Sequence, residues 1–159
     1  MNIKIFAIGK IKENYLKIGV EEYCKRLKNY ASVSIIEVDD ESVKENPSSG
    51  EIEIAKNKEG QRVLKLLKPT DYLIGLDLNK KEMTSEEFAT YLDHKIALAN
   101  STLSFVIGGS YGLSDELKKR CNDSISLSKM TFLHQMTRLI LLEQIYRAFK
   151  INKNEVYHK

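Results

Sequence analysis

The sequence is short of the features that mark several large classes of protein. It has no tryptophan, two prolines and only two cysteines, Cys24 and Cys121, in 159 residues. Two separated cysteines are too few for a metal cluster, and they are typical of a reducing cytosol. No apolar run approaches the ~18 residues of a membrane span, and the amino-terminal run is too short for a signal peptide. We therefore expect a soluble, cytoplasmic protein with neither a membrane partner nor a metal.

The sequence also lacks the two common glycine-rich nucleotide fingerprints. Its most distinctive stretch, residues 102–113, reads TLSFVIGGSYGL. The glycine pattern GGSYG does not fit G-x-G-x-x-G, and no G-K-[ST] occurs, so neither a dinucleotide-binding turn nor a P-loop is predicted. The apolar run before the glycines is typical of a strand buried on both faces. A strand that ends in glycines favours a ligand site at the carboxyl edge of a sheet, and a simple tight turn is the alternative.

The composition predicts one folded domain spanning residues 1–159. Hydrophobic residues make up 42% of the chain and charged residues 30%, which suits a globular domain with its own core. The 25 Lys and Arg residues exceed the 22 Asp and Glu residues only slightly. The resulting net charge of +3 neither demands nor excludes a polyanionic partner.

Strands and helices are predicted to alternate along the chain. Short branched or aromatic runs predict strands, and apolar residues spaced by three and four predict helices. The predicted strands are residues 2–8, 32–38, 71–78, 103–107 and 124–127. The predicted helices are residues 13–30, 51–68, a helix that begins after Thr84, 114–121 and 133–149. Gly60 weakens the second helix by roughly 1 kcal/mol relative to alanine. The alternation indicates an α/β fold with a mainly parallel sheet flanked by helices.

The last predicted helix is apolar on more than one side. Its apolar residues between Leu133 and Phe149 cover more than one ~100° stripe of the helix surface. One face of a sheet is too small to cover such a helix. A homodimer partner is the simplest second surface, and complete burial within one chain is the alternative.

Three motifs, in order along the chain, resemble a known family. LSFVIGGSYGL, LSKMTF followed by His134-Gln135, and the terminal Tyr157-His158-Lys159 resemble the ribosomal RNA large subunit methyltransferase H family of the SPOUT superfamily. The resemblance spans the whole chain. It implies a SPOUT-type α/β fold with a carboxyl-terminal trefoil knot, a homodimer, and S-adenosyl-L-methionine as the cofactor. It also implies methylation of N3 of a pseudouridine in large-subunit rRNA on the assembled ribosome.

The resemblance assigns the cofactor contacts to three segments that each follow a strand. It implies that S-adenosyl-L-methionine is bound by Leu76, Gly108, Leu127, Ser128, Lys129, Met130, Thr131 and Phe132. Apolar side chains and exposed amides suit an adenine ring, and Gly108 permits close approach of a ligand. Taken alone, LSKMTF is also consistent with a strand-to-helix connection. The chain departs from the family at Lys80, where glycine is usual, and at Leu133, where proline is usual. We expect the first change to alter a turn and the second to break no hydrogen bond.

The resemblance places catalysis and RNA binding near the carboxyl terminus. Methylation of an imide nitrogen requires the N3 proton to leave, so the site needs a proton acceptor or a group that stabilises the anion. His158 is the predicted acceptor because an imidazole with a pKa of about 6.5 is largely neutral at physiological pH. Tyr157 is predicted to act beside it by stacking on a base. Arg138, Arg147 and Lys159 are predicted to bind RNA phosphate.

Several alternatives stay open at this point. Arg138 or Arg147 would instead pair with Glu143 within the helix, and His134 would contact cofactor or substrate, cap the last helix or satisfy backbone groups in the core. The polar tail is also consistent with a frayed terminus. In a homodimer, the tail of one subunit would complete the cofactor site of the other. The alternative functions are a non-catalytic ribosome- or RNA-binding module of the same fold, and an α/β enzyme that uses another adenine-containing ligand.

Overall fold

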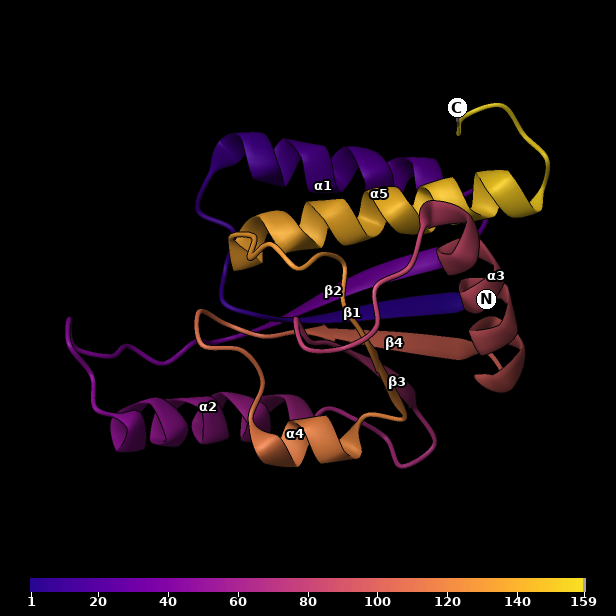
Figure 1. Ribbon diagram of the computed structural model, residues 1–159. Coiled ribbons are helices and arrows are strands. Elements are labelled where there is room, and N and C mark those ends of the chain that lie inside the picture. The colour runs from indigo at the N-terminus through magenta and orange to yellow at the C-terminus, as the bar shows by residue number, and fades with distance from the viewer. Residues whose placement is uncertain (159) are drawn as a thin grey trace.

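A parallel sheet of five strands, in the order β2-β1-β4-β3-β5, forms the centre of the protein (Figure 1). This computed structural model describes residues 1–158. The strands are β1 (Asn2–Ile8), β2 (Ser32–Val38), β3 (Tyr72–Leu76), β4 (Thr102–Ile107) and β5 (Asp123–Ile125). Every neighbouring pair runs parallel, which confirms the α/β fold with a mainly parallel sheet.

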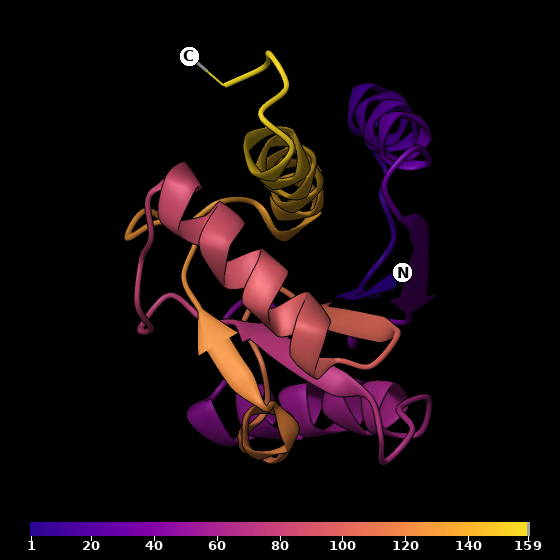
Figure 2. The same ribbon diagram turned by 90° about the vertical axis from the view of Figure 1, so that its right-hand side faces the viewer.

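Helices cover both faces of this sheet. They are α1 (Asn14–Leu27), α2 (Ser49–Leu64), α3 (Ser85–Leu98), α4 (Asp115–Arg120) and α5 (His134–Asn152). Helices α1, α3 and α5 lie on one face, and α2 and α4 lie on the other, as Figure 1 and Figure 2 show. None of these helices, in the part of the chain that the structure describes, combines the length and the hydropathy that a membrane crossing requires.

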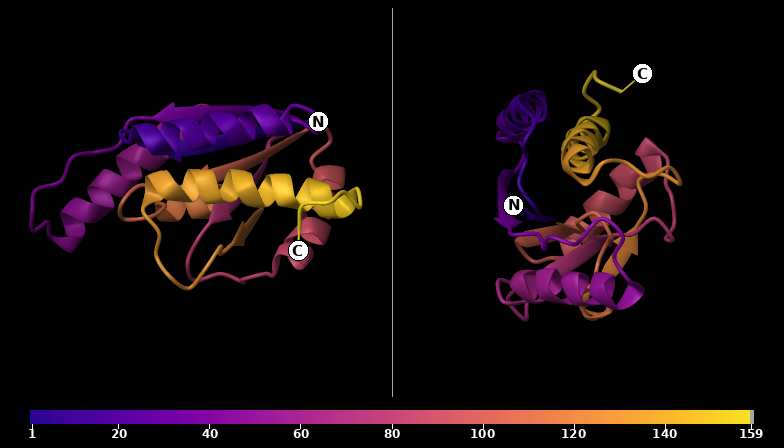
Figure 3. Two further views of the ribbon diagram at one scale, coloured as in Figure 1. Left: turned by 90° about the horizontal axis from the view of Figure 1, so that it is seen from above. Right: turned by 90° about the vertical axis from the view of Figure 1, so that its left-hand side faces the viewer.

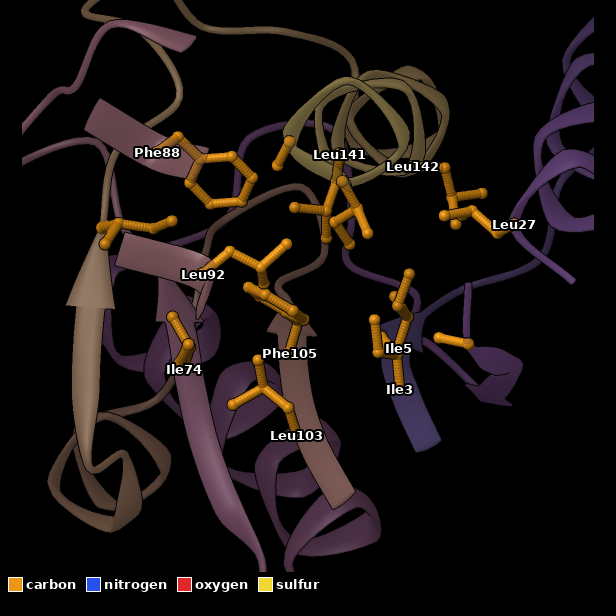
Figure 4. Packing of buried hydrophobic residues seen from close by; sticks show 14 of the residues in the cluster. Ile3, Ile5, Leu27, Ile74, Phe88, Leu92, Leu103, Phe105, Leu141 and Leu142 are labelled. Atoms are coloured by element: carbon orange, nitrogen blue, oxygen red, sulfur yellow. The ribbon is translucent and has the colours of Figure 1, made fainter. Parts of the chain in front are cut away.

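Strands β1, β3 and β4 are apolar on both faces, and helices cover each face. Along β1, Ile3 and Ile5 point into the core beneath α1, α3 and α5, whereas Phe6 and Ile8 belong to a second core beneath α2 and α4. The central strand β4 divides its side chains in the same way. Figure 4 shows the larger core, in which Phe105 lies among the side chains of neighbouring strands and of α3 and α5. Two buried faces explain the continuous apolar runs in the sequence.

Parallel pairing brings the carboxyl ends of the strands to one edge of the sheet. In Figure 1 this edge lies at the left, together with the beginning of α5. The chain runs outward from β1 to β2, and β4 later returns to lie between β1 and β3. Open α/β sheets bind ligands at this kind of edge, where the order of the strands reverses.

The helix boundaries follow their capping residues. Thr84 caps α3 in the predicted capping box, since its hydroxyl accepts from Glu87 N and the Glu87 carboxylate accepts from Thr84 N. The prediction for α2 began two residues too late. The Ser48 hydroxyl accepts from Glu51 N, so the helix already includes Ser49 and Gly50.

The apolar surface of α5 is covered largely within its own chain. Its buried residues include Leu141, Leu142 and Ile145, and the helix packs against both α1 and α3 (Figure 3). Gly19 permits the close approach of α1, because a Cβ atom at that position would lie 3.0 Å from a methyl carbon of Leu139. Besides the sheet, α1 and α3 of the same chain therefore cover much of the apolar surface of α5. The trefoil knot and the homodimer stay predictions.

Candidate functional site at the carboxyl edge of the sheet

A cavity of about 760 Å³ lies at the carboxyl edge of the sheet. Three loops, the first turn of α5 and Lys118 of α4 line it. The loops follow β3, β4 and β5, and they are separated by long stretches of the chain. Of the eight residues predicted to bind the cofactor, seven line this cavity: Leu76, Gly108, Leu127, Ser128, Met130, Thr131 and Phe132. Lys129 is exposed and does not line it.

The loop after β3 is ordered by Asp77. Its Oδ1 accepts from Asn79 N at 3.0 Å, and its backbone carbonyl accepts from Lys80 N at 3.2 Å. Such a side-chain turn needs no residue with positive φ. Lys80 indeed has none, so the missing glycine is accommodated without left-handed strain. This loop ends in a bridge between Glu82 and Ser126 that joins it to the loop after β5.

The loop after β4 is a tight turn in which Gly112 N donates to Gly109 O at 3.1 Å. Gly112 has a φ of 86°, which favours glycine. A Cβ atom at Gly108 would lie 2.6 Å from the backbone carbon of Gly112. Gly108 is therefore needed for the chain to fold back on itself. The sequence suggested that Gly108 permits the close approach of a ligand. In the structure, Gly108 also permits the close approach of Gly112.

Glu59 of α2 supports this turn from the α2 side of the sheet. Its carboxylate is 5% exposed and accepts from Glu41 N at 3.0 Å. A Cβ atom at Gly109 would lie 3.2 Å from Glu59 Oε2, so the carboxylate packs directly against the turn. Burial raises the pKa of Glu59. The glycine turn thus lies on a partly desolvated acid that the sequence did not single out.

Serine hydroxyls shape the loop after β5. Ser126 Oγ donates to Ser128 O at 2.9 Å, and Met130 N donates to Ser128 Oγ at 3.0 Å. These bonds fix the loop without regular secondary structure. They leave the Met130 side chain 75% exposed at the cavity, where an apolar ligand surface would cover it.

The first turn of α5 completes the wall with Leu133, His134 and Thr137. Leu133 has a φ of −54°, which is the value that proline prefers, so the proline usual in the family would fit here. His134 does not cap the helix. Burial lowers the pKa of His134, which keeps the imidazole neutral at physiological pH.

Arg138 lies in the interior and is not presented to a substrate. It is 2% exposed; its guanidinium donates to Glu37 Oε2 at 2.7 Å and to the carbonyl of Gly9 at 3.2 Å. Its partner is thus Glu37 of β2 and not Glu143. A buried, paired guanidinium does not favour the predicted contact between Arg138 and RNA phosphate. The sequence could not show this burial, because apolar periodicity along α5 does not reveal which side chain the strand ends cover.

Tyr157 is docked against α1 and α5. Its hydroxyl lies 3.1 Å from both Tyr23 Oη and Glu143 Oε1, and its ring meets the Tyr146 ring edge-on at 4.9 Å. The Arg147 guanidinium lies over the Tyr157 ring, 4.8 Å from its centroid. Burial raises the pKa of the Tyr157 phenol, which stays protonated. The tail is therefore held by specific contacts and is not frayed at this residue.

His158 has a partner at each ring nitrogen. Nε2 lies 2.7 Å from Glu86 Oε1, and Nδ1 lies 3.1 Å from Arg147 Nη1. Arginine can only donate, so Nδ1 carries the lone pair and Nε2 carries the proton. Arg147 also pairs with Glu143, as the alternative reading of the sequence had it. The RNA contact predicted for Lys159 lies outside the described residues.

The tail and the cavity of one chain lie far apart. His134 begins α5 beside the cavity, and Arg147 holds the tail 13 residues further on, which is ~20 Å along the helix axis. In Figure 1 the beginning of α5 and the carboxyl-terminal segment lie toward opposite ends of this helix. The predicted catalytic pair and the predicted cofactor contacts therefore do not meet within a single chain.

Sequence reasoning missed two charged residues of the wall, Asp77 and Lys118. Asp77 follows Leu76 directly, and its position at the end of a strand was a usable signal. Lys118 gave none, because it is one of several lysines in a short polar helix and reaches the cavity only through the packing of α4 against α2.

The fold and the cavity define an α/β protein with a cavity of ligand size at the carboxyl edge of its sheet. Comparisons with known proteins identify the class. The model of a family described as "Predicted SPOUT methyltransferase" matches residues 1–158. The solved structure described as "putative methyltransferase Lpg2936 from Legionella pneumophila in complex with the bound cofactor SAM" superposes with a TM-score of 0.51 and 12% identity, covering 94% of this chain and 66% of that one. At this identity the similarity shows the fold alone.

Curated relatives narrow the family further. A protein from Exiguobacterium sp. is 52% identical over 159 residues, and one from Bacillus anthracis is 53% identical, each match covering 100% of both chains. Both are named "Ribosomal RNA large subunit methyltransferase H". The chain belongs to this family of SPOUT methyltransferases, which confirms the resemblance drawn from its motifs.

Proposed function

We propose that the protein transfers a methyl group from S-adenosyl-L-methionine to N3 of a pseudouridine in large-subunit rRNA, on the assembled ribosome in the cytoplasm. The observation that carries the proposal is the convergence of seven expected cofactor contacts, from three separate loops, on one cavity. Full-length identity to relatives named as rRNA large-subunit methyltransferases supports the substrate class.

The cavity suits the proposed cofactor. Its volume of about 760 Å³ falls within the 300–1,000 Å³ typical of small-molecule sites. Leu76, Leu127 and Phe132 offer apolar surface to an adenine ring, and the loop backbones around them supply hydrogen-bonding groups for its edge. The wall also contains one acidic and one basic side chain, so it matches a ligand that carries both charges.

The reaction asks two things of the protein. Bound S-adenosyl-L-methionine would supply an electrophilic methyl carbon, and S-adenosylhomocysteine would be the leaving group that keeps the electron pair of the C–S bond. The chain has to hold the pseudouridine with N3 facing that carbon, and it has to give the N3 proton an acceptor. His158 is the acceptor of the proposed site, with Tyr157 beside it. Because Nδ1 of His158 faces Arg147, that contact has to open before the ring takes up a proton.

The separation of the two halves of the proposed site supports a homodimer. The tail is held ~20 Å along α5 from the cavity of its own chain, so a second copy has to bring its Tyr157 and His158 to this cavity. In this proposal, each active site is completed by a partner subunit. Arg147 and Lys159 of the same tail region are the proposed contacts for RNA phosphate.

A methyl-transfer assay tests the proposed function. Radiolabelled S-adenosyl-L-methionine is incubated with intact ribosomes or with naked rRNA, and the digested nucleosides are identified by mass spectrometry. The proposal predicts 3-methylpseudouridine from ribosomes. Ribosome binding without label transfer would favour the non-catalytic module, and label on another nucleoside would refute the N3 specificity.

A subunit-mixing experiment tests the composite site. One variant lacks residues 157–159, and the other carries Leu76→Arg in the cavity; both should be inactive alone. Random re-assortment makes half of the dimers mixed, and each mixed dimer holds one intact site of two. The mixture should therefore recover about a quarter of the wild-type activity. No recovery, with dimers verified by sedimentation, would show that the tail acts on the cavity of its own chain.

A further inference from the structure

Two side chains give the otherwise neutral cavity a charged end. Of the described residues that line it, only Asp77 and Lys118 carry a formal charge at neutral pH, apart from the titratable His134. Asp77 stands at the end of β3, and Lys118 reaches the same place from α4. The rest of the wall is made of apolar side chains, hydroxyls, a single amide side chain and glycine backbone.

The two charges face each other but are not firmly bonded. Lys118 Nζ lies 3.6 Å from Asp77 Oδ2, the widest spacing among the ion pairs of the described residues, which otherwise do not exceed 3.0 Å. A bonded N⁺–H···O⁻ contact spans about 2.7–2.9 Å. Asp77 is held in place because Oδ1 accepts from Asn79 N, and its side chain is 10% exposed. The Lys118 side chain is more open to solvent, at 40% exposed.

Such a pair is complementary to a zwitterion. The amino-acid end of the proposed cofactor carries an ammonium and a carboxylate on neighbouring atoms, and both lose water when the ligand is bound. Charged groups are buried at low cost only where opposite charges meet them. The neutral walls of the cavity offer none. A fixed carboxylate beside an exposed ammonium supplies both partners at one place, and their wide contact leaves both groups able to bond to the ligand.

We propose that Asp77 and Lys118 bind the amino-acid end of S-adenosyl-L-methionine, with Asp77 on its ammonium and Lys118 on its carboxylate. This assignment rests on the proposed function. It orients the cofactor, because the adenine ring is then left to the apolar surface of Leu76, Leu127 and Phe132. It also makes the pair a specificity element that distinguishes ligands with an amino-acid end from plain nucleosides.

Calorimetry with truncated ligands tests the assignment without any methyl transfer. S-adenosylhomocysteine has the amino-acid end, whereas 5′-methylthioadenosine keeps the adenine and the ribose but lacks that end. Asp77→Asn and Lys118→Met should each weaken binding of S-adenosylmethionine and S-adenosylhomocysteine by roughly tenfold to a hundredfold. Neither change should alter methylthioadenosine binding by more than about twofold.

Matched variants serve as controls. Lys119→Met removes a positive charge, as Lys118→Met does, but from the neighbouring, exposed position of α4. Asp93→Asn removes a negative charge, as Asp77→Asn does, but from an exposed position of α3. Both control variants should bind every ligand as the wild type does. Lys118→Arg should restore most of the affinity, since arginine also binds carboxylates. Thermal melts should show all variants folded, because a partly exposed ion pair contributes little stability.

The outcomes separate this assignment from the proposed function. Equal losses for ligands with and without the amino-acid end would overturn the assignment and would indicate ribose or general binding instead. Unchanged affinities would overturn it as well. If the wild-type protein failed to bind S-adenosylmethionine at all, the proposed function would fall, and the assignment with it.

Discussion

Gly60→Ala should destabilise the protein even though it improves a helix. Gly60 lies in the interior of α2, where alanine is favoured by about 1 kcal/mol. The structure opposes that gain. A Cβ atom at this position would lie far inside van der Waals contact of Ser114 Oγ and 3.2 Å from Ser114 Cβ. The glycine is therefore required where α2 packs against the beginning of α4.

The magnitude follows from what Ser114 does. Its side chain is 1% exposed and caps α4 by accepting from Leu117 N at 3.2 Å. Overpacking such a contact costs about 1–3 kcal/mol, and displacing the cap costs about 1 kcal/mol more. After the gain in helix propensity, a net loss of about 1–3 kcal/mol remains. For a chain of this length, that lowers Tm by roughly 2–12 °C.

Urea denaturation of a double-mutant cycle checks this reasoning. Ser114→Gly removes both clashing atoms, and glycine caps a helix nearly as well as serine. In the Ser114→Gly background, Gly60→Ala should therefore become neutral or stabilising by up to about 1 kcal/mol. If Gly60→Ala stabilises the protein in both backgrounds, the packing argument is wrong. If it destabilises both equally, the loss does not arise from Ser114.

Three further predictions follow from single contacts. Leu133→Pro should raise the free energy of unfolding by about 0.4–1 kcal/mol in urea melts, because Leu133 already has the φ of proline; a loss would mean that its N–H is needed. Glu37→Ala should lower the free energy of unfolding by about 3–5 kcal/mol, because it leaves the buried guanidinium of Arg138 without its carboxylate partner. Arg138→Met should lower it by less, because the partly exposed Glu37 carboxylate can then be hydrated; the reverse order in melts would contradict this. Burial raises the pKa of Glu59 above 4.5, so the folded protein loses stability as pH rises from the unfolded-state pKa through the higher folded-state pKa. The stability of Glu59→Gln relative to wild type should therefore increase from pH 4.5 upward, and a constant difference would show that the carboxyl titrates normally.

The sheet was predictable because its signals are local. The strands at residues 2–8 and 32–38 were predicted with the observed bounds, since short runs of branched apolar residues leave little ambiguity. The capping box at Thr84 was also visible in the sequence. The start of α2 was missed by two residues because Ser48, Ser49 and Gly50 resemble a loop by composition, and only the hydroxyl of Ser48 makes them a helix start.

The contacts that build the site were less predictable. The motifs, through the family resemblance, supplied seven lining residues of the cavity, but the family pattern did not supply Lys118. Its role depends on the packing of α4 beside the end of β3, a tertiary fact without a periodic signal. The burial of Arg138 against Glu37 joins residues 101 positions apart, and a basic residue on an apolar helix does not reveal such a partner.

The reason for Gly60 was hidden in the same way. The sequence showed only its cost to the helix, and the benefit lies in the approach of Ser114 from another helix. Glycines within predicted helices therefore carry information about packing that propensity alone cannot express.

The most direct test of the central claim is an amide NMR titration of the isotopically labelled protein with S-adenosylmethionine. We expect saturation with one ligand per chain and shifts concentrated in three segments, residues 76–79, 108–112 and 127–133. Amides near Arg147, at the end of α5 that contacts Tyr157 and His158, should shift only if the cavity of a partner subunit lies against that end of the helix. Shifts confined to other surfaces, or saturable binding that leaves these three loops unaffected, would contradict the claim that they enclose the cofactor.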